Sequence, residues 1–338
     1  MNEVLTSDQQ READGYTILN EPISSIDLME RASVEFVKSI IPYILGKQTI
    51  HVFCGTGNNG GDGLAVARML REKGCATHIY LIRYSKDLSA DCRMNLAKLR
   101  DVKEITDAKE IPEIHSDHVI IDAIFGTGLS RPVEGFAADV IRLINASMAR
   151  TLSIDIPSGL PCDDVPFDKG AVVRAHFTAT FERPKLAFFL PESAPYIYEW
   201  KVISIGLNQE FIKSLQSKNY YISEHLFHCK IKPRLRFSHK GTYGHGLLIA
   251  GSLGKMGAAI LSARGALRSG IGKITVHVPR SGNDIIQISV PEAMCTLDEN
   301  LDKITALPPL ADYNAIGIGP GLGQGEHAFN LLSSLFKT

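Results

Sequence analysis

The residues best suited to binding or chemistry in this 338-residue chain form a glycine-rich segment, Gly55-Thr-Gly-Asn-Asn-Gly-Gly-Asp-Gly63. The segment lies between a predicted buried strand and a predicted helix. Glycines there permit close approach of the backbone to a ligand, and a helix N-terminus offers free N–H groups and a positive potential. A tight turn with a packing role alone would not need polar side chains between its glycines. The expected ligand is an anion such as a phosphate.

Two acidic residues occupy similar positions further along the chain. Asp122 and Asp155 each lie at the end of a predicted strand, and in an open parallel sheet ligands bind outside the carboxyl ends of the strands. We therefore expect these loops to meet the glycine-rich segment. Asn59, Asp122 and Ser158 would then offer oxygen ligands with one formal charge, which suits a weakly charged hard cation. The alternative is that each aspartate only caps its own loop.

The elements that position these residues follow from the pattern of apolar residues. Buried strands are predicted at 49–54, 77–82, 119–123 and 151–156. Helices are predicted at 25–41, 64–73, 91–99 and 136–146. Alternating strands and helices predict an α/β fold with a doubly wound parallel sheet, covered on both faces.

A second α/β pattern begins after a polar stretch. It contains strands at 246–250, 274–278 and 315–318 and helices at 258–269 and 326–337. We therefore predict a first domain over 1–210, a linker over 211–230 and a second domain over 231–338. The few strands of the second pattern lead us to expect only the N-terminal portion of a domain there.

Composition excludes several classes of protein. Lys and Arg number 36 and Asp and Glu number 37, so the net charge of −1 predicts no general attraction to nucleic acid or to an anionic membrane. No apolar run is long enough to span a bilayer, and the polar N-terminal stretch is not a secretory signal. The six cysteines form no Cys-x-x-Cys pair, which predicts reduced thiols and a cytoplasmic protein.

A dinucleotide-dependent oxidoreductase is one alternative function. Gly55, Gly57 and Gly60 fit the G-x-G-x-x-G pattern, although this pattern alone is a weak signal. The second strand ends at Arg83 where an acidic residue would hold the ribose hydroxyls, and an arginine there favours the 2′-phosphate of NADP. No constellation for hydride transfer accompanies it. A non-catalytic dinucleotide-binding protein is the other alternative.

The motifs together resemble those of the NAD(P)H-hydrate epimerase family over about residues 5–210. They are Gly55-Thr-Gly-Asn-Asn-Gly-Gly-Asp-Gly-Leu-Ala-Val-Ala-Arg68, Asp122-Ala-Ile-Phe-Gly-Thr-Gly-Leu-Ser-Arg-Pro132, Asp155-Ile-Pro-Ser-Gly159, Thr180-Phe-Glu-Arg-Pro-Lys185 and Leu28-Met-Glu-Arg31. The later part of the chain resembles the ADP- or ATP-dependent NAD(P)H-hydrate dehydratases. Its motifs are Phe237-Ser-His-Lys-Gly-Thr-Tyr-Gly-His245, Gly257-Ala-Ala259, Arg268-Ser-Gly270 and Gly317-Ile-Gly-Pro-Gly-Leu-Gly323. This order is that of the bifunctional NAD(P)H-hydrate repair enzymes.

The resemblance implies a Rossmann-like epimerase domain, a ribokinase-like dehydratase domain and a set of site residues. Substrate would contact Asn58, Asn59, Gly60, Gly61, Asp62, Gly126, Thr127, Gly128, Leu129, Ser130, Arg131, Pro132 and Asp155. In the second domain it would contact Ala258, Gly321 and Gly323. A potassium ion would bind Asn59, Asp122 and Ser158.

The implied reaction interconverts the R and S forms of hydrated NADH or NADPH by loss and readdition of the ring hydroxyl. Asp155 is the expected acid–base group, since a positioned carboxyl contributes about 10²–10⁴-fold. Lys185 is a second candidate, with a surface lysine as the alternative. We expect a homo-oligomer. We also expect a C-terminally truncated dehydratase domain that lacks turnover by itself, with ADP or ATP needed by the complete protein.

Overall fold

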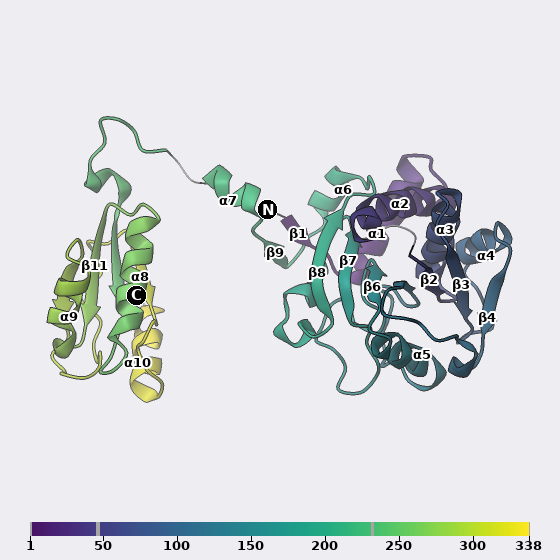
Figure 1. The fold of residues 1–338 in the computed structure, drawn as a ribbon. Coiled ribbons are helices and arrows are strands. Elements are labelled where there is room, and N and C mark those ends of the chain that lie inside the picture. The colour runs from purple at the N-terminus through teal and green to yellow at the C-terminus, as the bar shows by residue number, and fades with distance from the viewer. Residues whose placement is uncertain (1, 45–47, 231–232, 338) are drawn as a thin grey trace. The chain divides into compact units, whose positions relative to one another are not determined.

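The chain is described by a computed structural model that covers residues 2–44, 48–230 and 233–337 (Figure 1). It divides into two compact units, Met1–Lys230 and Ile231–Thr338, called here the first unit and the second unit. Each unit has its own sheet and its own apolar core.

The first unit is built on a seven-stranded sheet with the order β4-β3-β2-β5-β6-β7-β8, and every strand pair in it is parallel. The strands are β2 (Ile50–Cys54), β3 (Thr77–Ile82), β4 (Val102–Ile105), β5 (Val119–Ala123), β6 (Arg150–Ile154), β7 (Ala175–Phe181) and β8 (Ile197–Ile203). The strand order reverses between β2 and β5, which precede the glycine-rich segment and the Asp122 loop. This topological switch point is where open α/β sheets bind ligands.

Helices cover both faces of this sheet, which confirms the predicted doubly wound fold. They are α1 (Ser7–Asn20), α2 (Ser25–Ile40), α3 (Asn58–Glu72), α4 (Ala90–Ala97) and α5 (Gly135–Ala146). Neighbouring strand residues alternate between two cores: Val52 packs with the helices α2 and α3, whereas Phe53 packs with α5. Figure 1 shows α5 on the opposite side of the sheet from α2 and α3.

The helix α3 begins earlier than the sequence indicates. We predicted a loop up to Gly63, because glycine has low helix propensity, but the helix starts at Asn58. Gly57 is the residue before the first turn, and no side chain caps the helix there, although its carbonyl accepts a hydrogen bond from Gly61 N at 3.1 Å. The first backbone N–H groups of α3 therefore remain available to a ligand.

The segment predicted as a linker is partly folded onto the first unit. It contains α6 (Gln209–Ser214), β9 (Asn219–Tyr221) and α7 (Glu224–Lys230). Ile212 is fully buried, and β9 pairs antiparallel with the N-terminal strand β1 (Asn2–Val4). The first compact unit therefore extends to Lys230, because α6 contacts α1 and β9 pairs with β1.

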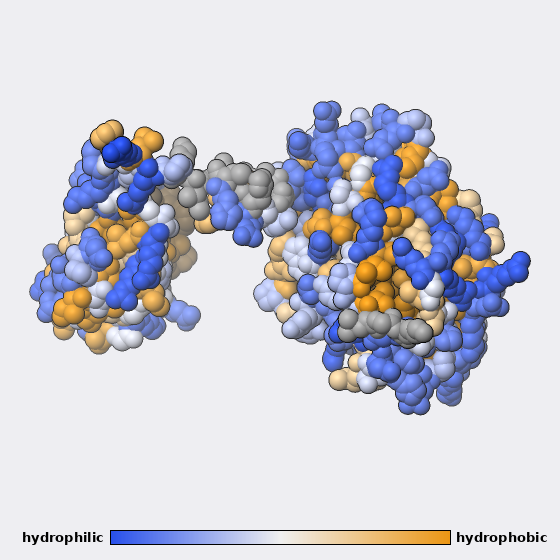
Figure 2. Space-filling view, turned by 45° about the horizontal axis from the view of Figure 1, so that its top comes forward, coloured by the Kyte–Doolittle hydropathy of each residue, from blue (hydrophilic) through white to orange (hydrophobic). Residues whose placement is uncertain are grey.

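The second unit contains a four-stranded sheet with the order β12-β11-β10-β13, and all of its pairs are parallel. Its strands are β10 (His245–Ile249), β11 (Lys273–Val278), β12 (Met294–Leu297) and β13 (Ala315–Ile318), and its helices are α8 (Met256–Arg268), α9 (Asn283–Ser289) and α10 (Glu326–Leu335). Hydrophobic residues are visible on the surface of this unit in Figure 2. The exposed ones include Leu261, Ile288 and Phe329.

Short 3₁₀ helices connect several of these elements. They are η1 (Ile41–Tyr43), η2 (Ala108–Glu110), η3 (Leu186–Phe189), η4 (Pro191–Ser193), η5 (Lys240–Tyr243) and η6 (Arg280–Gly282). The cysteines Cys54, Cys75, Cys92, Cys162 and Cys295 are free thiols. The side chain of Cys229 lies outside the described residues.

A group of histidines lies at the amino ends of the strands, away from the glycine-rich segment. His51 in β2 and His78 in β3 are register partners with stacked rings, and His51 Nε2 lies 2.9 Å from His118 Nδ1. Burial, followed by the charges of the neighbouring histidines, lowers the pKa of His51 from 6.5 to about 4. A proton on His51 is therefore much less favourable in the folded chain than in the unfolded chain.

The stability of the first unit should fall in mild acid because of His51. The stabilising contribution of the neutral His51 ring is present in full above pH 6.5. It is lost as the pH falls toward 4, because the unfolded chain takes up the proton first. We expect a loss of roughly 2 kcal/mol between pH 7 and pH 4.5. Urea unfolding followed through Trp200, the single tryptophan, measures it. His51→Gln should decline less steeply over this range; an equal decline would contradict the assignment to His51.

Candidate active site

The loops predicted to converge line one cavity of about 490 Å³ in the first unit. Ten of the predicted substrate-binding residues line it: Asn58, Asn59, Asp62, Gly126, Thr127, Gly128, Leu129, Ser130, Arg131 and Asp155. Other lining residues were not predicted, among them Gln10, Arg11, Asp14, Tyr84, Phe181 and Ile205. The cavity therefore lies at the carboxyl ends of β2, β5 and β6, with α1 contributing to its wall.

Gly60, Gly61 and Pro132, which were also predicted to contact the substrate, do not line this cavity. Gly60 has a packing role, since a Cβ atom there would lie 1.9 Å from the Gly55 carbonyl oxygen. Gly55 is equally confined, because a Cβ atom on it would lie 1.9 Å from Ile124 O. These contacts bring the turn after β2 directly against the turn after β5.

Two of the predicted cation ligands, Asn59 and Ser158, meet at the carbonyl group of Phe125, and Asp122 is linked to them through Ser158. Asn59 Nδ2 donates to this oxygen at 2.9 Å and Ser158 Oγ donates to it at 3.2 Å. Ser158 N donates to Asp122 Oδ2 at 2.8 Å. The three side chains come from α3, β5 and the loop after β6, so the fold brings them together from distant parts of the sequence.

The chemistry of this group fits a hard monovalent cation. Asp122 is fully buried, and its carboxyl group has no ion pair with a basic side chain among the described residues. Burial raises the pKa of Asp122, and hydrogen bonds from Ser158, Ser153 and Ile124 oppose that shift. Across residues 2–44, 48–230 and 233–337, no cluster of three or more His, Cys, Asp or Glu could hold a metal ion. The three predicted ligands offer oxygen atoms and include one buried carboxylate.

Asp155 is held in place by its backbone and by three contacts to one oxygen. Its φ angle is +64°, a left-handed conformation, and its N–H donates to Ala179 O at 2.9 Å. The Oδ1 atom accepts from Phe181 N at 2.9 Å and from Thr180 Oγ1 at 3.1 Å, and lies 2.8 Å from Lys185 Nζ. Among the described residues, Oδ2 is the carboxylate oxygen that has no hydrogen-bond or ion-pair partner.

Lys185 is a buried residue, so the alternative of a surface lysine is wrong. It is 1% exposed, it donates to Phe181 O and to Arg183 O at 3.2 Å each, and it forms the ion pair with Asp155. It does not line the cavity. Its position is suited to orienting Asp155, not to contacting a ligand.

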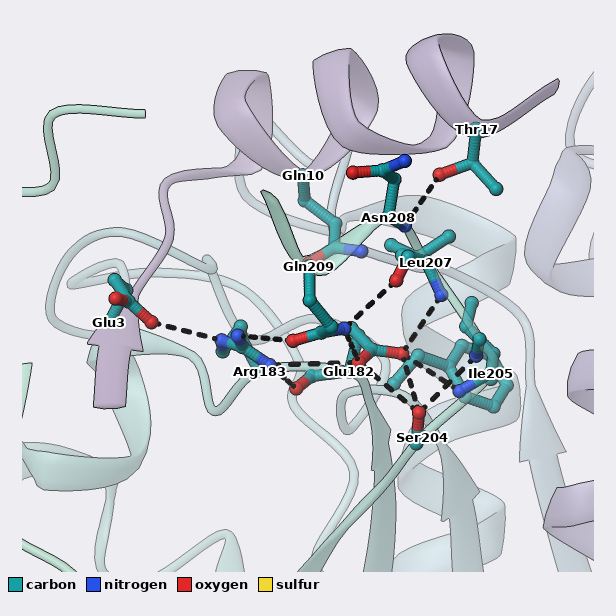
Figure 3. Close-up of polar contacts among 12 residues, drawn as sticks. Glu3, Gln10, Thr17, Glu182, Arg183, Ser204, Ile205, Leu207, Asn208 and Gln209 are labelled. Atoms are coloured by element: carbon teal, nitrogen blue, oxygen red, sulfur yellow. Dashed lines mark hydrogen bonds and ion pairs between the residues drawn. The ribbon is translucent and has the colours of Figure 1, made fainter. Parts of the chain in front are cut away.

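A network centred on Glu182 supports this part of the site (Figure 3). The buried Glu182 carboxylate accepts from Ile205 N at 2.9 Å, from Ser204 Oγ and from Gln209 Nε2 at 2.6 Å. Arg183 donates to Gln209 Oε1 at 2.8 Å. The network ties the end of β7 to the segment after β8, and Figure 3 shows Gln10 of α1 pointing toward it.

Arg83, the residue that favoured an NADP-dependent oxidoreductase, is engaged elsewhere. Its guanidinium donates twice to Glu104, at 2.9 and 3.0 Å, and it does not line the cavity. The neighbouring Tyr84 does line it, and its ring stacks on Phe125 with a centroid distance of 4.5 Å. The position after β3 therefore presents an aromatic ring to the cavity, not a positive charge.

Two of the residues predicted to bind substrate in the second unit lie together. A Cβ atom on Gly321 would lie 3.1 Å from the Cβ of Ala258, so the glycine turn rests on the first turn of α8. The Gly321 carbonyl also accepts from Ser252 Oγ at 2.7 Å. Gly323 has a φ of +92° and its nearest side chain is His327.

Comparisons with known proteins agree with these features. The family model of the YjeF-related protein N-terminus matches residues 25–187, and the model of NAD(P)H-hydrate dehydratase matches residues 246–338. An NAD(P)H-hydrate epimerase of Limosilactobacillus fermentum is 37% identical over 194 residues, which cover 57% of this chain and 92% of that protein. The chain belongs to the NAD(P)H-hydrate epimerase family.

This member of the epimerase family also resembles longer proteins. The bifunctional NAD(P)H-hydrate repair enzyme Nnr of Moorella thermoacetica is 32% identical over 335 residues, covering 93% of this chain and 62% of that enzyme. The chain thus spans about three fifths of the length of such bifunctional relatives. The crystal structure of the yeast protein YNL200c matches with a TM-score of 0.54 at 19% identity, covering 66% of this chain and 97% of that one, which supports the fold.

One expectation from the sequence needs correction. We expected this epimerase-family chain to carry a truncated dehydratase domain without dehydratase turnover. The dehydratase family model matches residues 246–338, so a domain of that family is present, and neither the truncation nor the absence of activity inferred from it is borne out. The short count of strands in the sequence pattern was an insufficient criterion, since it missed β12 of the second unit.

Proposed function

We propose that the first unit interconverts the R and S forms of hydrated NADH and NADPH. Membership of the NAD(P)H-hydrate epimerase family supports this reaction. The structural observation that carries it is the Asp155 carboxylate, which is fixed through Oδ1 while the residue borders the cavity. A positioned carboxylate beside a cavity is what an acid–base reaction on the nicotinamide ring requires.

The chemistry has two steps. The hydroxyl carbon of the hydrated ring is bonded to the ring nitrogen, so that loss of the protonated hydroxyl as water leaves a cation stabilised by the nitrogen lone pair. Addition of water to the other face, with loss of a proton, gives the other epimer. Asp155 would exchange a proton with the oxygen and stabilise the cation by its negative charge. Lys185 would act as a positioning residue for this carboxylate.

The function is tested by separating the two hydrates chromatographically after incubation with the purified chain. We expect pure S or pure R hydrate to become a mixture, without any redox partner. A change of nicotinamide absorbance that depends on a second substrate would instead indicate an oxidoreductase. Tight binding without interconversion would indicate a non-catalytic dinucleotide-binding protein.

We further propose that Asn59, Asp122 and Ser158 hold a potassium ion. The bound ion would place a positive charge beside the buried Asp122 carboxylate and supply a fixed positive charge near the cavity. Its ligands would join the start of α3, the end of β5 and the loop after β6, because each of these segments contributes one of them.

Potassium should stabilise the first unit. Replacing choline chloride by potassium chloride at constant ionic strength should raise the thermal midpoint, followed through Trp200, by roughly 5 °C. The physical reason is that the ion binds the folded site and compensates the buried charge of Asp122. Asp122→Asn should lose this rise, whereas Asp139→Asn, at an exposed position of α5, should keep it. An equal rise in both variants would argue against the assigned ligands.

For the second unit we propose dehydration of the S hydrate with consumption of ADP or ATP, supported by the dehydratase family match. Adding ADP or ATP with magnesium to the S hydrate and following the return of nicotinamide absorbance tests this activity. Ala258, Gly321 and Gly323 are the proposed substrate contacts.

A small-molecule substrate, a homo-oligomeric state and a cytoplasmic location complete the proposal. Within the described part of the chain, none of the helices is both long and apolar enough to cross a bilayer. Size-exclusion chromatography with light scattering measures the oligomeric state.

A further inference from the structure

The helix α1 contributes an acidic residue to the cavity that the family match does not cover. Asp14 and Gln10 both line the cavity, together with Asp62 of α3 and Asp155 after β6. The epimerase family model begins at residue 25, so α1 lies outside it. The Gln10 Nε2 atom lies 3.4 Å from Asp14 Oδ1 and donates to it.

Specific contacts fix α1 at both ends. At its start, Ser7 donates to Asp163 from its backbone N–H at 3.0 Å and from its hydroxyl at 2.7 Å. Near its end, Thr17 Oγ1 accepts from Asn208 N at 3.1 Å. The ring of Tyr16 stacks on Phe211 with a centroid distance of 4.0 Å. The side chains that α1 presents to the cavity are therefore held at a defined position.

An unpartnered polar atom beside Asp14 points to a ligand. Gln10 is only 6% exposed, and its Oε1 atom has no hydrogen-bond partner in the part of the chain that the structure describes. A buried amide oxygen without a partner costs about 1–3 kcal/mol, unless a bound molecule supplies a donor. Gln10 lines the cavity, so its amide group lies in the cavity wall next to Asp14.

The surroundings of Asp14 make it a proton donor near neutral pH. Burial, and then the negative charge of Asp155, raise the pKa of Asp14 from 3.8 to about 6, while Lys185 acts in the opposite direction and Glu182 adds a small increase. Burial also raises the pKa of Asp62 well above its ordinary value. The remaining charged or titratable residues around the cavity are Arg11, Tyr84 and Arg131.

We propose that Asp14 is a second acid–base group of the epimerisation, working with Asp155 so that the two carboxyls serve the two faces of the ring. This inference rests on the proposed epimerase function. An epimerisation by loss and readdition of water needs a proton given on one face and a proton taken on the other. One carboxylate fixed by Lys185 cannot reach both faces, whereas Asp14 on α1 and Asp155 after β6 come from separate elements that both line the cavity.

The proposed step balances as follows. Asp14 gives its proton to the ring hydroxyl, the carbon–oxygen bond breaks with its electron pair on oxygen, and water leaves. The ring nitrogen lone pair forms the carbon–nitrogen double bond of the cation. A water molecule then adds to the opposite face, a new carbon–oxygen bond forms, and Asp155 takes the released proton. In the reverse direction the two carboxyls exchange roles. In each direction one carboxyl begins protonated and the other ionised, so that Asp14 and Asp155 carry one proton between them.

The test compares the wild-type chain with Asp14→Asn and Asp14→Glu. Rates of interconversion of purified S- and R-NADHX are measured from pH 5 to pH 8, with the enzyme-free rate subtracted. Because one shared proton is required, we expect the wild-type rate to fall as the pH rises above about 6. Asp14→Asn should lower the rate about 10²-fold and abolish this fall. Asp14→Glu should restore part of the rate and a titration of its own.

Matched controls separate this role from a structural one. Glu12→Gln removes an exposed carboxylate from the same helix and should keep both the rate and the pH profile. The unfolding transition of Trp200 shows whether each variant is folded. A wild-type chain that interconverts the hydrates, with Asp14→Asn at the same rate and pH profile, would overturn this inference alone. A folded wild-type chain without interconversion would overturn the proposed function and this inference together.

Discussion

Asp155→Asn is expected to slow the interconversion of the R and S hydrates by about 10²–10⁴-fold. The amide can neither take up nor release a proton at neutral pH, and it has no negative charge to stabilise the ring cation. Asparagine tolerates the left-handed backbone that Asp155 adopts at a φ of +64°. The variant should therefore fold, and the loss should appear as a lower turnover in the chromatographic assay with purified epimers.

An exposed neighbour provides the control for this change. Asp164→Asn alters an exposed carboxylate in the following loop that accepts a hydrogen bond from its neighbour Val165 N, and it should leave the rate unchanged. Unfolding followed through Trp200 distinguishes a chemical loss from a folding defect. Wild-type turnover in a folded Asp155→Asn chain would remove Asp155 from the reaction.

Gly55→Ala is expected to destabilise the first unit by about 3 kcal/mol and to disrupt the cavity. The added Cβ atom would lie 1.9 Å from Ile124 O and 2.8 Å from Ile124 C, and both contacts are to backbone. The turns after β2 and β5 would have to separate, which would also pull apart the predicted cation ligands Asn59 and Asp122. Urea unfolding followed through Trp200 measures the loss.

Gly128→Ala is the matched control, because it also adds one methyl group to a glycine, here one in the loop after β5 that borders the cavity. Apart from its chain neighbours, no described residue has an atom within 4 Å of the added Cβ atom at this position, so the free energy of unfolding should change by less than about 0.5 kcal/mol. Equal unfolding midpoints for Gly55→Ala and the wild-type chain would show that the two turns can move apart without cost.

Much of the first unit can be predicted from the sequence because its parallel strands are buried on both faces. Such strands appear as continuous apolar runs, and the strands predicted at 77–82 and 119–123 are β3 and β5 with the same bounds. The site follows from the same pattern. Side chains at the carboxyl ends of strands must share one edge of the sheet, which is why Asn59, Asp122 and Asp155 could be expected to meet.

The contribution of α1 could not be predicted in this way. Its buried residues Gln10, Ala13 and Thr17 are small or polar, so the helix shows no apolar stripe. Its place over the cavity depends on long-range contacts, such as that between Ser7 and Asp163, which no local pattern encodes. The same limit applies to Lys185, whose burial results from the turn after β7 and not from its residue type.

The left-handed turn at Asp155 means that the main chain, more than a choice of rotamer, delivers the carboxylate to the cavity. Its amide and its Oδ1 atom are both tied to the neighbouring strand, at Ala179 and at Phe181. A designer who wished to graft this carboxylate onto another scaffold would therefore have to transplant residues 153–156 and 179–185 as one block. Copying the aspartate alone would leave its carboxylate without the contacts that orient it.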